Sequence, residues 1–153
     1  MIFQFNIMQR AFPDDSPEMD EFRQWIPSIH ALAEASEGFI WRATDERDSS
    51  LSQRLGDDFL TNLTAWESVN ALYQFVFHPL HREIMMQRDR WFKHAGKPLS
   101  VMWHASSPHV FPTQADGLDR LEQLWRDGPS ADAFDLSFAQ RQGLANRDLL
   151  FRP

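Results

Sequence analysis

The sequence predicts a single-domain α+β protein in which an antiparallel sheet packs against helices. Three observations support this prediction. Short segments in which apolar and polar residues alternate recur along the chain, as is typical of half-buried strands. Longer segments between them carry apolar residues at intervals of three and four, as amphipathic helices do. A chain of 153 residues with 42% hydrophobic residues has the size of one domain with a substantial core.

The first strand and the first helix are predicted near the N-terminus. Large apolar residues occupy every second position of 2–8, which indicates a strand. Ser16 is a candidate N-cap with Pro17 at the first helical position, and the apolar stripe that follows ends before Gly38. Because Pro27 lies inside this stripe, we expect a kink or two short helices near it.

Two further strands are predicted over 39–44 and 59–66. The segment between them, 45–58, is charged, contains serine and has few large apolar residues. This composition is typical of a mobile connection. It could act as a lid over a site, or it could be a solvated hairpin loop.

A second helical region is predicted to begin at Glu67, directly after the third strand. Pro79 breaks it and opens a second helical segment, which ends at Gly96. The fourth strand follows over 99–104. The order is then βαββαβ, that of a ferredoxin-like antiparallel sheet.

A further helix is predicted after the fourth strand, because Thr113 and Asp116 resemble a capping box. We place the main domain in residues 1–128 and a C-terminal extension in 129–153. Alternating apolar residues from Phe134 onward suggest that the extension adds a strand, or that it packs on the domain or on a partner subunit.

The alternation gives the sheet two unlike faces. One is strongly apolar and is assigned to the side covered by the two main helical regions: Phe3, Phe5, Ile7, Leu63, Ala65, Leu99, Val101 and Trp103. The other is mixed: Gln4, Asn6, Met8, Ile40, Arg42, Thr44, Leu60, Asn62, Thr64, Trp66, Ser100, Met102 and His104. A mixed face suits a ligand cavity or a wet subunit interface that back-to-back dimerisation would shelter. The alternative is a semi-exposed face of a monomer.

Composition excludes several functions. A net charge of -7 disfavours nucleic acid and anionic membranes as partners. The absence of cysteine excludes disulfides, thiolate nucleophiles and cysteine-ligated zinc. With no basic leader and no segment long enough to span a bilayer, we expect a cytoplasmic protein. The 13 Phe and 6 Trp suit either a packed core or a pocket for a flat ligand.

Two segments resemble a known family, and they read NLTAWESVNALYQFVFHPLHRE over 62–83 and LAEASEGFIWR over 32–42. Together they resemble the bacterial domain-of-unknown-function family 3291, which is similar to the antibiotic biosynthesis monooxygenase superfamily of dimeric α+β barrels. The resemblance implies a homodimeric barrel that binds a small, flat, partly apolar or aromatic molecule between sheet and helices.

The resemblance further implies a cofactor-free monooxygenase or other tailoring enzyme acting on a polyketide-like substrate. Asn62 and Trp66 resemble the Asn and Trp of such sites, where the amide would bind a phenolate or carbanion within dry aromatic walls. Arg42 or Arg82 would hold the anion. Alternatively, Trp66 caps a helix and Asn62 satisfies a neighbouring backbone group.

The candidate site residues fall into two groups. The catalytic candidates are Asn62, Trp66, Arg42 and His104. The substrate-binding candidates are Asn6, Trp41, His81, Arg82, Met85 and Trp91. Of these, Trp41 and Trp66 would wall the cavity, and Arg42, Arg82 or His104 would handle charge or protons. No cofactor and no metal are expected.

Two alternatives remain open. Barrel haem oxygenases carry an Asn on the first strand, which Asn6 resembles, and an axial His after the third strand. Met85 falls at that position and His81 lies one turn earlier, a departure that weakens the haem interpretation. His78 and His81 also have a His-x-x-His spacing, without an evident third metal ligand. The other alternative is a non-catalytic ligand carrier or a partner of an enzyme.

Overall fold

A computed structural model describes residues 1–44 and 49–146. In this part of the chain, β1 (Ile2–Gln9), β2 (Phe39–Arg42), β3 (Phe59–Trp66) and β4 (Ser100–His104) form a four-stranded antiparallel sheet in the order β2-β3-β1-β4. The α-helices are α1 (Asp20–Ala35), α2 (Ser49–Leu55), α3 (Val69–Val76), α4 (Pro79–Met86), α5 (Gln114–Asp127) and α6 (Leu136–Arg141). Single 3-10 turns span Pro17–Met19 and Arg88–Arg90. The predicted α+β class and βαββαβ order are confirmed.

The central strands β1 and β3 pair along their whole length, from Ile2 opposite Trp66 to Gln9 opposite Phe59. The alternation in the sequence sets this register, because a slip of one residue would exchange the two faces of a strand. It places Asn6 directly opposite Asn62. None of the helices in residues 1–44 and 49–146 is long and apolar enough to cross a membrane.

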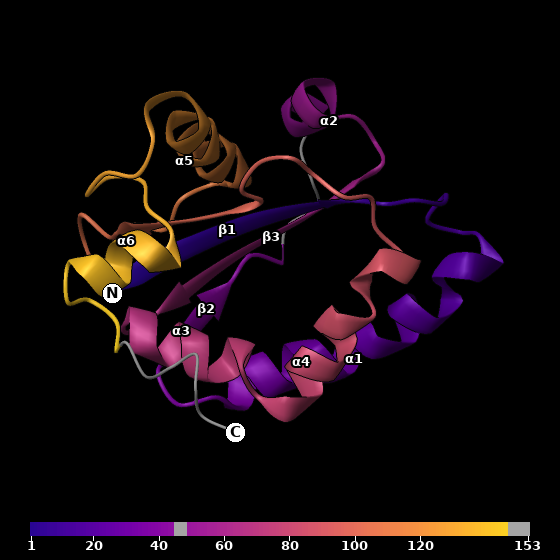
Figure 1. The fold of residues 1–153 in the computed structure, drawn as a ribbon, viewed down its shortest axis with the longest axis horizontal. Helices are drawn as coiled ribbons and strands as arrows, with labels where there is room; N and C mark the ends of the chain where they lie inside the picture. The colour runs from indigo at the N-terminus through magenta and orange to yellow at the C-terminus, as the bar shows by residue number, and fades with distance from the viewer. Residues whose placement is uncertain (45–48, 147–153) are drawn as a thin grey trace.

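Helices cover both faces of the sheet, with α2 and α5 on one side and α1, α3 and α4 on the other (Figure 1). The apolar face, which includes Phe3 and Phe5, packs against Leu51 of α2 and Leu118 and Leu121 of α5. Our assignment of this face to the two main helical regions was therefore wrong. Those regions, α1 and α3/α4, close over the mixed face instead, because α5 supplies the apolar stripe that the other face needs.

Because helices of the same chain cover both faces, neither face needs back-to-back dimerisation to shelter it. The homodimer inferred from the sequence stays a prediction.

α1 runs unbroken from Asp20 to Ala35 with Pro27 inside it, so the expected division near Pro27 is absent. Phe22 and Ile29 pack into the same apolar cluster on either side of the proline, and tertiary packing of this kind holds a helix across a missing hydrogen bond.

β2 ends at Arg42 and carries a β-bulge between Phe39 and Trp41. Phe39 therefore packs edge-on against Trp66, with ring centroids 5.3 Å apart, on the α1 side of the sheet. Trp41 packs against Phe111 at 4.9 Å on the α5 side. Strict alternation had placed both residues on one face, but the extra residue of a bulge breaks that alternation.

Helix α2 occupies much of the segment expected to be an irregular connection, which corrects the prediction for 49–55. Leu51 is 0% exposed, and Leu55 packs against the same cluster. Two leucines four residues apart are enough to anchor a short helix by one face. Residues 45–48, where the remainder of the suggested lid begins, lie outside the described residues.

Two further boundaries differ from the prediction. α4 ends at Met86 rather than near Gly96, and a 3-10 turn then brings Trp91 into the core. In the extension, Phe134 makes a single antiparallel bridge to Met102 of β4. A helix follows instead of a strand, because the Asp135 side chain accepts a hydrogen bond from the backbone N–H of Phe138 at 2.7 Å and caps α6.

Candidate functional site

A connected set of polar side chains crosses the sheet on the face covered by α1, α3 and α4. Gln4 Nε2 donates to Asn6 Oδ1 at 3.1 Å and to Ser100 Oγ at 2.9 Å. Gln4 Oε1 accepts from Thr64 Oγ1 at 3.1 Å, and Asn62 Nδ2 lies 3.4 Å from Asn6 Oδ1. These residues of β1, β3 and β4 meet because they occupy alternate positions on one face. We call Gln4, Asn6, Asn62, Thr64 and Ser100 the amide band.

Apolar clusters close both ends of the amide band. At one end, Trp66 packs with Ala33 of α1 and Leu72 of α3. At the other end, Met8 and Leu60 pack against residues of α1 and α4. The amide band is therefore a polar strip between two dry regions, where hydrogen bonds are stronger than in water.

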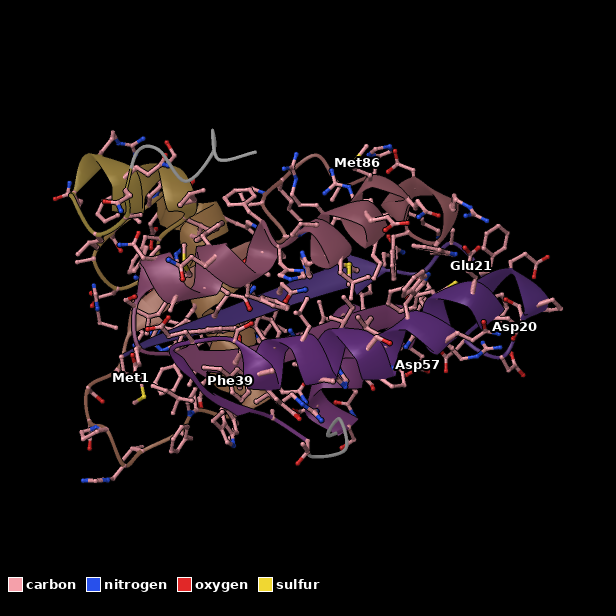
Figure 2. The ribbon with its side chains drawn as sticks, turned by 90° about the horizontal axis from the view of Figure 1, so that it is seen from below. Met1, Asp20, Glu21, Phe39, Asp57 and Met86 are labelled. Carbon is pink, nitrogen blue, oxygen red and sulfur yellow. The ribbon has the colours of Figure 1, made fainter. Side chains whose placement is uncertain are left out.

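Two neighbouring atoms of the amide band are open. Within residues 1–44 and 49–146, Asn6 Nδ2 and Asn62 Oδ1 make no hydrogen bond, and neither atom is buried without a partner. Solvent therefore reaches both atoms, although β1 and β3 are the central strands. Seen from the helix side, β1 is visible between α1 and the α3/α4 pair (Figure 2). A free hydrogen-bond donor, Asn6 Nδ2, and a free acceptor, Asn62 Oδ1, are thus carried by two residues that lie opposite each other in the sheet.

Trp66 anchors one end of the amide band from within the core. It is 0% exposed, its Nε1 donates to Thr64 Oγ1 at 3.0 Å, and its ring stacks on Phe75 with centroids 5.3 Å apart. The helix-capping alternative does not apply, because Ser68 caps α3 by accepting from the N–H of Ala71. Trp66 holds Thr64 in place and is itself shielded from solvent.

Charged groups lie at the β2 side of the amide band. Arg42 pairs with Thr64 in the sheet, and its Nε lies 2.7 Å from Glu34 Oε1 of α1. Partial burial, together with the Arg42 charge, lowers the pKa of His30 on the same helix, although Glu34 opposes this shift. Arg42 is thus already neutralised by a carboxylate, which reduces its capacity to hold a second anion.

His81 lies beyond Trp66, with its ring 4.7 Å from that of Phe75. Its Nδ1 lies 2.9 Å from the carbonyl oxygen of Val76, an arrangement that places the proton on Nδ1 and leaves a lone pair on Nε2. Burial lowers the pKa of His81, despite the opposing effect of that hydrogen bond. His81 is therefore an oriented, neutral imidazole at physiological pH.

The lowered pKa of His81 predicts a pH-dependent stability. The unfolded chain takes up a proton near the ordinary pKa of 6.5, whereas the folded chain does so only at lower pH, so the free energy of unfolding falls as pH drops below about 6.5. We expect His81→Asn, which keeps a donor toward Val76 but does not titrate, to flatten this fall. Urea unfolding at pH 7.5 and 5.5 measures it.

His30 and the carboxylates contribute equally to the wild type and to the variant, so the difference between the two curves isolates His81. Parallel curves for the wild type and His81→Asn would show that His81 is not buried in its neutral form.

Several of the predicted residues lie away from the amide band. Trp41 lies on the opposite face of the sheet and cannot wall the same space as Trp66. Trp91 is 1% exposed and packs against Phe22 in the apolar cluster beyond Met8. His104 is exposed at the end of edge strand β4, with its ring 5.4 Å from that of Phe134.

Arg82 and Met85 line a cavity of about 430 Å³ between the end of α3 and the region of Met86 to Asp89. The lining does not include Asn6, Asn62 or Trp66. The structure therefore separates Arg82 and Met85 from the amide band.

The described residues do not assemble the haem ligand set considered above. Met85 belongs to the cavity just described, whereas His81 does not line it. Asn6 Oδ1 already accepts from Gln4 and Asn62. His78 caps α4, accepting from Leu80 N at 3.2 Å, and no group of three or more metal-ligating side chains occurs in the part of the chain that the structure describes.

Gln4, Thr64 and Ser100 were not among the predicted site residues, although the sequence contained a signal for them. Strand alternation placed all three on the same face as Asn6 and Asn62. The signal that was missed is the repeated occurrence of hydrogen-bonding side chains in the middle of adjacent strands, where apolar residues are usual.

The fold and the amide band define a class of protein: an α+β domain whose sheet carries an accessible polar strip beneath two helical regions. The model of a family described as a domain of unknown function, DUF3291, matches residues 1–147, and the chain belongs to this family. No curated protein matches the chain. A structure of SnoaB, described as a cofactor-independent oxygenase from Streptomyces nogalater, is similar with a TM-score of 0.49 and 14% identity, over 72% of this chain and 97% of that chain.

Proposed function

We propose that the protein binds a small planar molecule carrying adjacent hydroxyl and carbonyl groups at the amide band, and oxidises it with dioxygen without a cofactor. The observation that supports this proposal is the pair of open atoms on Asn6 and Asn62. Asn6 Nδ2 would donate to a carbonyl or enolate oxygen, and Asn62 Oδ1 would accept from a hydroxyl. The apolar clusters at either end would contact the faces and edges of the ring system.

The chemistry suited to this arrangement begins with proton loss from an acidic C–H group that is conjugated with the carbonyl. Asn6 would stabilise the resulting enolate by hydrogen bonding. The proton would pass to solvent water, because Phe75 and Trp66 lie between the His81 ring and the amide band and keep this imidazole out of hydrogen-bond reach. With an anthrone as substrate, the enolate reacts with dioxygen, the CH2 group becomes a carbonyl, and the second oxygen atom leaves as water.

Asn62→Ala should weaken binding of 1,8-dihydroxyanthrone about tenfold, because one hydrogen bond to the ligand is lost, on the order of 1.4 kcal/mol. Affinity is measured anaerobically by tryptophan fluorescence quenching. Aerobic formation of the anthraquinone, followed by absorbance and mass spectrometry above the spontaneous rate, measures turnover. The matched control is Asn146→Ala, which removes an exposed side-chain amide; the backbone N–H of Asn146 donates to Asn70 of α3.

Unchanged affinity and turnover in a folded Asn62→Ala protein would refute the site. Binding without oxygen-dependent product, in the wild type as well, would instead support the carrier alternative. The amide band is compatible with that outcome, because its two open atoms can hold a ligand by hydrogen bonds without activating it.

A further inference from the structure

A second hollow lies on the face of the sheet opposite the amide band. It measures about 700 Å³ and lies among α2, α5 and the chain that leads from α4 to β4. That chain passes from the side of α4 to the side of α2 and α5 (Figure 1). None of the predicted site residues lines this cavity, so it is a second site, independent of the proposed function.

The floor of this cavity is apolar and incompletely packed. It is formed by Ile7, Leu55, Phe59, Leu99 and Trp125, which all belong to or border the main apolar cluster. Ile7 is buried, whereas the others keep part of their surface open. Partly exposed apolar side chains around a concave space favour an apolar guest, because each square ångström removed from water contributes about 25 cal/mol.

The rim of the cavity is basic. It is lined by Lys93, His94, Lys97 and Arg54, and Glu122 is the one carboxylate among the described residues of the lining. Arg54 is neutralised by ion pairs of 2.8 Å to both Asp119 and Glu122. Lys93 has a 4.0 Å contact with Asp58, at an exposed position.

Lys97 is the cation available at this rim. Its Nζ lies 3.5 Å from the ring centroid of Trp125, and it makes no ion pair within residues 1–44 and 49–146. Trp125 is fixed in turn, because its Nε1 donates to the carbonyl oxygen of Pro98 at 2.7 Å. The ring thus orients an unpaired ammonium group at the edge of an apolar space.

We infer that this cavity binds an amphipathic organic anion, with its aromatic or alkyl body on the floor and its carboxylate or sulfonate at Lys97 and Lys93. The apolar floor accounts for the body, and the unpaired charge accounts for the anionic head. A chain with a net charge of -7 would repel such an anion elsewhere on its surface, so the basic rim also provides selectivity.

Two probes with the same apolar body separate the charge from the floor. They are 1-anilinonaphthalene-8-sulfonate, an anion, and N-phenyl-1-naphthylamine, its neutral counterpart. We expect both to bind with increased fluorescence, the anion more tightly. Lys97→Met should weaken anion binding about five- to tenfold and leave the neutral probe unchanged, because only an ion pair is lost. Arg141→Gln, at an exposed residue of α6, is the charge-matched control.

The position of the probe is read from the indole N–H signals in 15N-labelled protein, with Trp125 assigned by Trp125→Phe. Binding at the proposed cavity shifts the Trp125 signal and spares that of Trp66 beside the amide band. A shift at Trp66 alone places the probe at the amide band and refutes the second site. Equal weakening by Lys97→Met and Arg141→Gln would show only a general charge effect and would also refute it.

Discussion

Trp66→Ala is expected to lower the free energy of unfolding by about 3–5 kcal/mol, the usual cost of removing a buried aromatic ring. The indole is 0% exposed and lies 5.3 Å from both Phe75 and Phe39, centroid to centroid. Its removal leaves a cavity at the junction of the sheet with α1 and α3 and also deprives Thr64 of a donor. Equilibrium unfolding in urea, monitored by far-UV circular dichroism, measures the loss.

Trp66→Phe is the matched control, because it keeps most of the ring but removes the N–H group. It should cost clearly less than the alanine variant. A loss below about 1 kcal/mol for Trp66→Ala would mean that the indole is not a core residue. The role predicted from the sequence, a wall of an open ligand cavity, would then be favoured again.

Gly117→Ala should destabilise the protein by about 2 kcal/mol, although alanine is favoured over glycine by about 1 kcal/mol inside a helix. Gly117 lies on α5 directly above Phe5, and an added Cβ would lie 2.6 Å from Phe5 Cγ and 2.9 Å from Phe5 Cβ. These atoms are at the rigid base of the side chain, so α5 must move away from β1 and loosen its contacts with the sheet.

Gly96→Ala is the control for the glycine substitution, since no atom lies within 4 Å of the added Cβ. It should leave the midpoint of thermal unfolding within about a degree of the wild type. If Gly117→Ala were instead stabilising, the gain in helix propensity would outweigh the contact, and α5 would be free to lift from the sheet at little cost.

The sequence predicted the strands well because their alternation is a local property. The period of two in β1 and β3 determines which residues share a face, and the observed register follows from it. In contrast, local sequence patterns do not determine which helices cover which face of the sheet. Alternation indicates that Phe5 is buried, but its partner helix, α5, lies more than a hundred residues away and is one of several amphipathic helices in the chain.

The candidate site shows the same contrast between features that are local in the sequence and features that depend on the packing of distant segments. Asn6 and Asn62 were correctly placed on one face by parity. Phe39 was misplaced because the bulge beside it has no sequence signature within Phe39–Arg42. The cation over Trp125 could not be predicted, since Lys97 and Trp125 meet only through the packing of α5 against the chain before β4.

The two proposed sites share one strand. Asn6 belongs to the amide band, whereas Ile7, the next residue, lines the cavity on the other face. A single inserted or deleted residue within β1 would exchange the two linings, presenting amides to the apolar floor and aliphatic groups to the polar strip. The two sites, one on each face of the sheet, therefore both constrain the length of β1. As related sequences diverge, this strand can accept substitutions far more readily than insertions or deletions.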